Sequence, residues 1–568
     1  MAACFFLTRL AIALSACLGL GGMACGPTRA AGGATCGTVI VPTAVGSGGS
    51  ATLTSFNPML TDALGAHQVI EQILRPLVWI DRHGKPDPER GLAQSVTTPD
   101  DGLTFVITLH DWKWSDGVPI TSDDLVFTFD LMHRLGTGYV YYGTGGMPTL
   151  VAGVTRLSDH QVQLRMVRKV NPDWFISLGL GNVLFPLPKH KFDGLSLVEL
   201  RRRQTDTSLF SVSSGPFLLQ DYQVGRHIVM VPNPLYGGHH PQIRRLVLAF
   251  PNGTTALEQL RSDNLDIANV PYLLAGLMGR LPGFDIVTLH PGFGYGDGYF
   301  NFHSHNAPFL ADDAVRRAIT RGIDQKQIID LVFHGQAVVD HAPVPASMTD
   351  MQSDRGRAGY PELSFDPAAA RAGLLADGWK PGADGIMARD GHRLAFTILT
   401  SAEGATNALQ AEVIQRNLRV VGMEVSIQLV GFNQLLATLD GNGHDWDLAV
   451  LLWSVATYPD VHDFFSSDGT ENFGHYLDPH MDQLNRDVMF GSGDGPLHAV
   501  EDYTADQAPH LYLPYPTPNV LVRPGLGGIT DFLSPNGMWS AELLTLSGPL
   551  ACPPGQPLAS GGADAPHA

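Results

Sequence analysis

The side chains that could do chemistry in this sequence are, first of all, its 22 histidines. Transition-metal sites need several nitrogen, sulfur or carboxylate ligands at tight spacing. The pairs that come nearest to such spacing are His239 with His240, His303 with His305, and His462 with His475. None of these pairs has a cysteine or a carboxylate at the spacing typical of a zinc or iron site, so no metal centre is expected.

Carboxylates form the second candidate group. The pairs Asp100-Asp101, Asp123-Asp124 and Asp312-Asp313 precede helical or turn patterns, where capping and the helix dipole explain them. The sequence contains no G-x-S-x-G nucleophile elbow, no G-x-x-x-x-G-K-[ST] phosphate loop and no H-E-x-x-H helix. We therefore expect a protein that is not an enzyme and that carries no cofactor.

The cysteines indicate export. Residues 10–24 form an apolar stretch after Arg9, which is typical of a secretory signal peptide over residues 1–25. Both Leu-Ser-Ala-Cys17 and Gly-Met-Ala-Cys25 resemble the end of a bacterial lipoprotein signal, so either cysteine could be lipidated. Cys36 and Cys552 could form a disulfide if the two ends of the fold meet, or could remain two separate thiols.

The elements that must position these side chains alternate between strands and helices. Strand patterns cover residues 38–41, 103–109, 424–430 and 447–453, and helical patterns cover 62–74, 123–132, 312–330 and 411–421. Such alternation predicts mixed α/β lobes, and 568 residues are enough for two or three of them. Residues 26–35 and 553–568 are rich in Gly, Ala and Pro and are expected to be flexible tethers.

The charge balance bears on which partners the chain could bind. The chain has 36 Lys and Arg against 55 Asp and Glu, a formal charge of −19 that is spread along the chain without a long acidic run. This balance disfavours nucleic acid. Beyond the signal, no stretch has the roughly 20 apolar residues that cross a bilayer, so we expect contact with the membrane only through a lipid anchor.

A set of ordered motifs resembles family 5 of the extracellular solute-binding proteins, over roughly residues 36–545. The motifs are VWIDRHGKP at 78–86, GLAQS at 91–95, DDGLTF at 100–105, KWSDG at 113–117, TSDDLVF at 121–127, SGPF at 214–217, PNPLY at 232–236, LRSDNLDI at 260–267, FNF at 300–302, VRRAI at 315–319, IDQ at 323–325, FDP at 365–367, LLADGW at 374–379 and AP at 508–509.

The resemblance implies a two-lobed α/β periplasmic-binding-protein fold of class II, with an extra subdomain in the first lobe. On this chain it implies a first lobe at 36–290 with an inserted subdomain at about 57–210, a second lobe at 291–515, and a return to the first lobe at 516–552. This layout brings Cys36 and Cys552 into one lobe and therefore favours a disulfide between them.

The implied function is capture of a peptide or similar small solute between the lobes and its delivery to the permease and ATPase subunits of an ABC importer. The protein is then an exported monomer of the periplasm or of the outer surface of the cell membrane. Other interpretations are a receptor of the same fold for a nickel chelate, an oligosaccharide or an amino-acid conjugate, a signalling co-receptor, or a chaperone-like binder.

The ligand is expected at the segment that follows the apolar run 447–453, at the carboxyl edge of a buried sheet. The predicted binding residues are Trp453, Ser454, Ala456, Tyr458 and Asp460 from the second lobe and Asn57 and Asp62 from the first. Packing residues at the lobe edge are the other interpretation of Trp453 and Tyr458. In the peptide-binding members, an aspartate three residues after the tryptophan holds the ligand ammonium, and this chain has Ala456 there.

Overall fold

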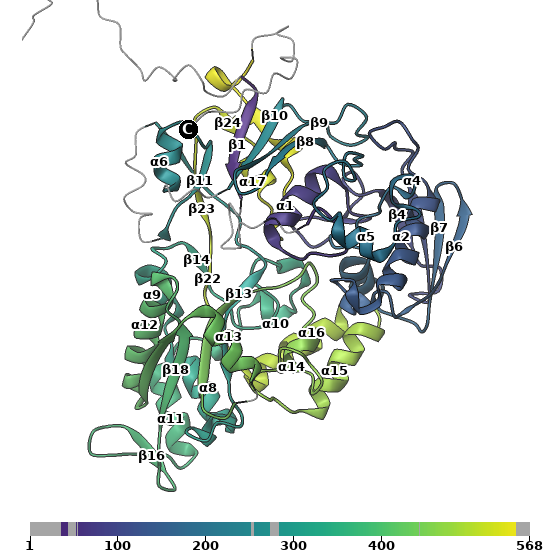
Figure 1. The fold of residues 1–568 in the computed structure, drawn as a ribbon. Coiled ribbons are helices and arrows are strands. Elements are labelled where there is room, and N and C mark those ends of the chain that lie inside the picture. The colour runs from purple at the N-terminus through teal and green to yellow at the C-terminus, as the bar shows by residue number, and fades with distance from the viewer. Residues whose placement is uncertain are drawn as a thin grey trace, which may run out of the picture.

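The computed structural model describes residues 36–43, 53, 55–250, 255–272, 283–441 and 443–552. The predicted signal peptide with Cys17 and Cys25, and the predicted tethers at 26–35 and 553–568, lie outside these ranges. The described residues form two α/β lobes joined by chain crossings (Figure 1). The predicted fold class is confirmed.

The first lobe is built on a four-stranded sheet in the order β1-β10-β9-β8. Its strands are β1 (Thr38–Pro42), β10 (Arg245–Ala249), β9 (His227–Pro232) and β8 (Phe217–Gln223), and β1 lies parallel to β10. A second sheet of this lobe joins β11 (Ile267–Asn269) and β12 (Asp285–Thr288) to the late strand β23 (Asn519–Val522). The end of the chain thus completes a lobe that its beginning started.

The two ends of the described fold are also joined covalently. A disulfide links Cys36 to Cys552, and the neighbouring Gly37 N–H donates to the Leu550 carbonyl at 3.0 Å.

A separate antiparallel sheet within the first lobe has the order β4-β5-β7-β6. Its strands are β4 (Ala93–Thr97), β5 (Thr104–Leu109), β7 (Gln161–Met166) and β6 (Val151–Ser158). Burial alternates along β5, as expected for a strand with one face in the core. Helix α2 (Ser122–Leu135) follows, and its third residue, Asp124, accepts from the Thr121 N–H at 2.9 Å as in a capping box.

The second lobe contains a five-stranded sheet in the order β19-β18-β20-β13-β21. Its strands are β19 (Glu424–Val430), β18 (Ala395–Ser401), β20 (Leu448–Ser454), β13 (Gly294–Phe300) and β21 (His510–Leu513). The glycines of β13 allow a close approach, because a Cβ at Gly296 would lie 2.8 Å from Leu513 Cβ and one at Gly298 would lie 2.9 Å from Leu511 Cβ.

Helices cover both faces of this sheet. One face packs with α8 (Asp313–Gly322), α11 (Pro367–Ala376) and α12 (Ala405–Val421) in a core of its own, and the other face joins the large core that continues into the first lobe. On the second face lie α13 (Phe432–Asp440), α14 (His462–Phe465), α15 (Pro479–Phe490) and α16 (Gly495–Gln507). The predicted helix over 312–330 is two helices, because α8 ends at Gly322 and Asp324 then caps α9 (Gln325–Leu331).

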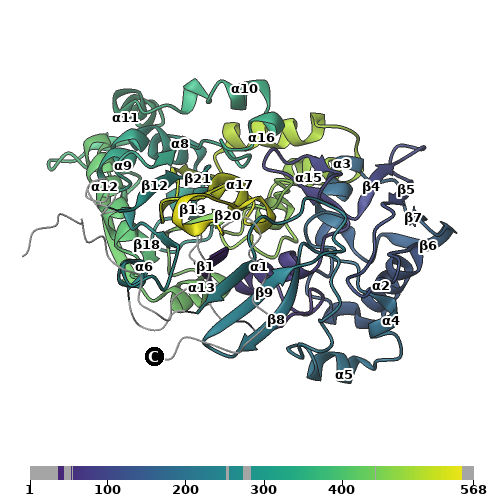
Figure 2. The same cartoon turned by 90° about the horizontal axis from the view of Figure 1, so that it is seen from above.

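The chain passes between the lobes twice. It leaves the first lobe between β12 and β13 and returns between β21 and β23, where β22 (Tyr515–Pro516) pairs with β14 (Ala337–Val338). Viewed from above, α3 (Pro172–Trp174) of the first lobe lies beside α15 of the second (Figure 2).

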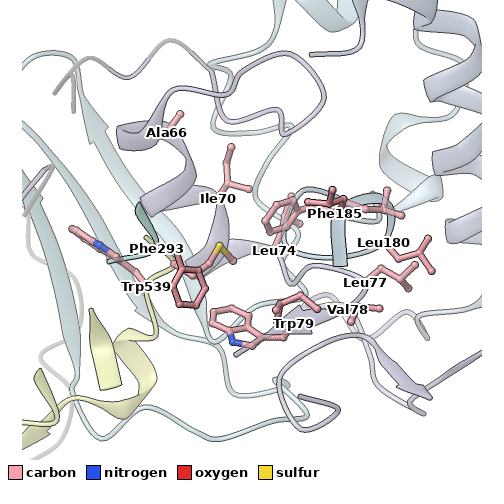
Figure 3. Packing of buried hydrophobic residues seen from close by; sticks show 14 of the residues in the cluster. Ala66, Ile70, Leu74, Leu77, Val78, Trp79, Leu180, Phe185, Phe293 and Trp539 are labelled. Carbon is pink, nitrogen blue, oxygen red and sulfur yellow. The ribbon is translucent and has the colours of Figure 1, made fainter. Parts of the chain in front are cut away.

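Helix α1 (Leu64–Ile73) stands at the centre of the first lobe. Ala66, Ile70 and Leu74 recur at four-residue spacing and pack into the large core with Phe185 and Phe293 (Figure 3). Across the described ranges, no helix combines the length and the apolar character needed to cross a membrane.

Candidate functional site

A cavity of about 210 Å³ lies where the two lobes meet. The first lobe contributes the start of α1, the 141–144 segment, the 177–183 segment and the 536–538 turn, and the second lobe contributes the residues directly after β20. The lining residues are Asp62, His67, Glu71, Tyr141, Thr144, Ser177, Leu178, Asn182, Val183, Val455, Ala456, Thr457, Asn536, Gly537 and Met538. A ligand in this cavity would touch both lobes.

Helix α1 supplies a polar face to the cavity. His67 and Glu71 are four residues apart and therefore lie on the same side of the helix. The His67 ring nitrogen Nε2 lies 3.1 Å from the Thr61 carbonyl, and burial lowers the pKa of His67, which favours the neutral ring. Since a carbonyl only accepts, we assign the proton to Nε2.

Tyr141 completes this polar face. Its hydroxyl oxygen lies 2.8 Å from His67 Nε2, within hydrogen-bond distance. Burial raises the pKa of Tyr141, so the phenol keeps its proton. The phenol therefore offers the cavity a group that can both donate and accept a hydrogen bond.

Glu71 is a buried acid beside the cavity. It accepts from the Trp539 N–H at 2.6 Å, and behind it Arg75 forms a buried ion pair with Glu542. Burial raises the pKa of Glu71 well above its usual range, against the opposing effects of the Trp539 hydrogen bond and Arg75. The environment therefore favours the uncharged carboxyl group.

The electrostatic character of the cavity follows from its lining. Among the lining residues that the structure describes, Lys and Arg do not occur, and Asp62 is an exposed carboxylate just before α1. The other polar groups are hydroxyls, amides, a neutral imidazole and a carboxyl group in an environment that favours protonation. Such a site suits a neutral or positively charged group of a ligand and disfavours an anion.

The second-lobe wall is the segment 455–457. Its backbone is fixed by a hydrogen bond from the Val455 N–H to the Phe293 carbonyl at 2.9 Å. The Thr457 hydroxyl donates to the Ser177 carbonyl at 3.2 Å, which ties the two walls of the cavity together. Ala456 is exposed and turns only a methyl group to the cavity.

Of the residues predicted to bind ligand, the structure brings Asp62 and Ala456 to the cavity. Trp453 is half-buried and packs edge-on against Phe464 at 5.2 Å, and the exposed Ser454 hydroxyl lies 3.2 Å from the Tyr515 hydroxyl. Tyr458 is only 1% exposed and belongs to the core. These three residues are not among the lining residues.

Asp460 and Asn57 also lie elsewhere. Asp460 accepts from Trp174 Nε1 at 2.6 Å and from the His462 N–H at 2.9 Å, so its carboxylate joins the lobes. Asn57 is fully buried and accepts from the Met59 N–H at 3.0 Å. Their observed contacts are structural.

Sequence reasoning missed most of the first-lobe wall. One signal was available, because His67 and Glu71 interrupt the apolar face of α1 at helical spacing. The residues Tyr141, Ser177, Asn182 and Asn536 come from remote segments, and only the tertiary fold brings them to the cavity.

Further contacts join the lobes beside the cavity. Asn171 Nδ2 donates to the Val488 carbonyl at 3.0 Å, and its N–H donates to the Met489 carbonyl at 2.8 Å. The Arg168 guanidinium lies 3.9 Å from the centre of the Phe490 ring. We call residues 168–174 the latch segment, because it connects the inserted sheet to α15 of the second lobe.

Comparisons with known proteins agree with this geometry. The model of the bacterial extracellular solute-binding proteins, family 5 middle region, matches residues 87–474. The oligopeptide-binding protein AppA of Bacillus subtilis is 25% identical over 530 residues, which cover 91% of this chain and 94% of AppA.

Solved structures show the same fold. AppA from Bacillus subtilis, in complex with a nonapeptide, has a TM-score of 0.66 at 22% identity, covering 90% of this chain and 99% of AppA. NikZ from Campylobacter jejuni, in complex with Ni(L-His), has a TM-score of 0.70 at 20% identity, covering 90% of this chain and all of NikZ.

Proposed function

This chain belongs to family 5 of the bacterial extracellular solute-binding proteins, and from that premise we propose that it captures a short peptide between its lobes and delivers it to an ABC importer. The chain binds and releases its ligand without covalent chemistry. The permease and the ATPase are separate subunits of the importer.

The observation that carries this proposal is a cavity with walls from both lobes. A ligand that touches both walls binds the closed arrangement more tightly than the open one, and this difference in affinity drives closure. A permease can then distinguish the closed, ligand-bound form from the empty receptor.

The chemistry of the lining supports a ligand with a free amino group. Asp62 is an exposed carboxylate at the cavity, and the described part of the lining has neither Lys nor Arg to compete for it. We propose that Asp62 contacts the ligand ammonium from the first lobe, since Ala456 offers no carboxylate in the second. Tyr141 and Thr144 are suited to hydrogen bonds with peptide carbonyl groups.

The size of the cavity supports a compact ligand. Pockets for drug-sized ligands enclose about 300–1,000 Å³, and this cavity encloses about 210 Å³. A dipeptide or tripeptide fits this scale better than a long peptide.

The remaining parts of the proposal concern organisation and location. We propose a first lobe at 36–290 and 516–552, a second lobe at 291–515, and a monomeric protein that is exported after cleavage of the signal peptide. Its location is the periplasm or the outer face of a membrane, with Cys17 or Cys25 as the candidate site of a lipid anchor.

A ligand screen tests the proposal. The tag-free chain beginning at Gly26 is heated with dipeptides, tripeptides, their N-acetylated forms, nickel–histidine and oligosaccharides, and hits are measured by calorimetry. A ligand at 100 times its Kd stabilises the folded state by about 2.7 kcal/mol, which raises the melting temperature measurably. Short peptides with free amino groups are expected to give the largest shifts.

The outcomes separate the alternatives. A hit from nickel–histidine or an oligosaccharide, with silence from every peptide, would overturn peptide capture and leave the receptor fold intact. Equal binding of free and N-acetylated peptides would overturn the role of Asp62 alone.

A further inference from the structure

Four histidines from three separate segments gather at one surface of the second lobe. They are His303 and His305 from the loop after β13, His444 from the segment before β20, and His475 from the loop before α15. We call this group the histidine cluster. Within the sequence only the His303/His305 pair is visible, because His444 and His475 lie more than a hundred residues away.

The rings of the cluster lie side by side. The ring centres of His305 and His444 are 4.8 Å apart, those of His303 and His475 are 5.2 Å apart, and those of His303 and His444 are 5.8 Å apart. With metal–nitrogen distances of about 2.0–2.1 Å, two imidazoles on one ion place their ring centres about 4.5–5.3 Å apart. Two of the observed pairs fall within this range.

The backbone beneath the rings is held firmly. The His305 N–H donates to the His444 carbonyl at 3.0 Å, and the Phe302 N–H donates to the Gly474 carbonyl at 2.9 Å. Asn301 Nδ2 donates to the Trp446 carbonyl at 2.8 Å. These bonds fix all three segments relative to one another, so the cluster does not depend on one flexible loop.

One ring nitrogen of His444 has a hydrogen-bond partner, and the other has its lone pair available. Its Nδ1 lies 3.1 Å from the His303 carbonyl, and since a carbonyl only accepts, Nδ1 carries the proton. The lone pair is then on Nε2, as in metal-bound histidines whose other nitrogen donates to a carbonyl.

From this arrangement we propose that the histidine cluster binds a divalent transition-metal ion of the kind that prefers imidazole, namely Ni²⁺, Cu²⁺ or Zn²⁺. In the described part of the chain no three metal-binding groups already converge on one point. His305 and His444 therefore form the primary pair, with the exposed ring of His303 turning toward the ion. The Asp445 carboxylate, 4.0 Å from His305 Nδ1, offers an oxygen nearby.

The cluster is distinct from the cavity between the lobes. Phe300 at the end of β13 pairs with Leu448 at the start of β20, and His303 and His305 follow the first while His444 precedes the second. The bond from the Phe302 N–H to the Gly474 carbonyl brings His475 to the same end of the sheet. The cavity residues 455–457 follow the other end of β20, which is about 20 Å away for a strand of this length. The ion would tie three loops of one lobe together without touching the captured ligand.

Titration of the metal-free, tag-free chain from Gly26 with NiCl₂, ZnCl₂ and CuSO₄ at pH 7.5 tests the proposal. We expect one ion per chain, with a Kd in the micromolar range for at least one metal. Because a ligand histidine must be neutral, affinity should fall at least tenfold at pH 5.5. The metal affinity of the double variant His305→Ala/His444→Asn should also be at least tenfold lower. Asparagine is chosen at position 444 because its amide can still donate to the His303 carbonyl.

The matched control removes two other histidines. His239→Ala/His240→Ala deletes an exposed pair of the first lobe and should bind metal as the unmodified chain does. If the double variant melts at a lower temperature than the unmodified chain in EDTA, the single change His305→Ala serves as the test instead, because the His305 side chain is 70% exposed. No saturable binding of any of the three ions, unchanged binding in the cluster variants, or an equal loss in the control would overturn the proposal.

Discussion

At the scale of single residues, the charge that the ligand meets is concentrated on Asp62. Burial lowers the pKa of His67 and raises the pKa of Glu71, which favours the uncharged form of both side chains. Asp62 is therefore the main charged group at the cavity. The second lobe contributes Val455, Ala456 and Thr457, none of which carries a charge. If the ligand carries an ammonium group, the first lobe must therefore supply its counter-charge.

The change Asp62→Asn tests this charge distribution. Charge-assisted hydrogen bonds contribute about 1.5–3 kcal/mol, so the Kd for a peptide with a free amino group should rise at least tenfold. The Kd for an N-acetylated peptide should stay within about twofold, because that ligand carries no ammonium group. Calorimetry with both ligands measures the two effects.

The control for this substitution is Asp111→Asn, which removes an aspartate side chain that is 88% exposed and is not part of the cavity lining. It should leave both affinities unchanged. Equal weakening of the two ligands by Asp62→Asn would mean that the residue shapes the cavity and does not contact the ammonium group.

The positions of individual site residues were only partly predictable. The buried strand before residue 455 predicted which segment reaches the cavity, and Ala456 lies there. The direction of each side chain depends on partners that are remote in sequence. Asp460, for example, accepts from Trp174, 286 residues away, and this contact has no signature in the local pattern.

At the scale of elements, the latch segment determines how firmly the lobes hold each other. Trp174 donates to Asp460 and Asn171 binds the end of α15, so closure has contacts of its own in addition to those of a ligand. The empty receptor opens only if these contacts are lost, and the ligand must stabilise the closed form beyond them.

The change Trp174→Phe should shift the balance toward the open form. It removes the N–H that satisfies the Asp460 carboxylate and retains an aromatic ring of smaller size. We expect small-angle scattering to show a larger radius for the empty protein, and the ligand Kd to rise several-fold. Trp112→Phe is the matched control, since Trp112 stacks on His110 within the first lobe. If the empty Trp174→Phe protein had the same radius as the unmodified chain, Trp174 would not hold the lobes together.

The segment after β14 carries a buried acid, Asp340, next to the crossing between the lobes. Its Oδ1 accepts from the Ala346 N–H at 2.6 Å, and its Oδ2 has no partner among the described residues. Burial raises the pKa of Asp340 to about 8. A carboxyl group with a raised folded-state pKa stabilises the fold fully at acidic pH and loses this contribution as pH rises toward 8.

Asp340→Asn should remove that pH dependence. Between about pH 4 and pH 7 the unmodified chain should lose at most about 4 kcal/mol through this group, and the variant should not. Urea midpoints at pH 5, 7 and 8 measure the difference, with Asp111→Asn as the exposed control. Parallel pH profiles for Asp340→Asn and the unmodified chain would show that Asp340 is already ionised at low pH.

Elements were easier to predict than their arrangement. The apolar run 447–453 appears as β20 (Leu448–Ser454), and the alternating pattern at 424–430 appears as β19 (Glu424–Val430). Periodicity alone did not reveal that the 312–330 pattern divides, since Asp324 acts as a cap only in a chain that turns there. Nor does it give the strand order, which depends on pairings such as β11 with β23 between residues about 250 apart.

At the scale of the whole molecule, the first lobe depends on both ends of the chain. Strand β23 lies between β11 and β12, and the disulfide joins Cys36 to Cys552 just outside the sheets. The second lobe is inserted between these parts and is continuous in sequence. Loosening the ends should therefore weaken the first lobe before it affects the five-stranded sheet.

The double substitution Cys36→Ser/Cys552→Ser tests this dependence in the chain beginning at Gly26. Closing a long loop stabilises a fold by about 2–4 kcal/mol, chiefly by restricting the unfolded chain, so the melting temperature should fall by a few degrees. Reductant should lower the melting temperature of the unmodified chain to the same extent and leave the variant unchanged. The variant and the reduced chain should both keep their ligand affinity, because neither cysteine lines the cavity. If the variant melts at the same temperature as the unmodified chain, strand pairing alone holds the ends together. If reductant lowers the melting temperature of the variant as well, the sensitivity to reductant arises elsewhere than at this disulfide.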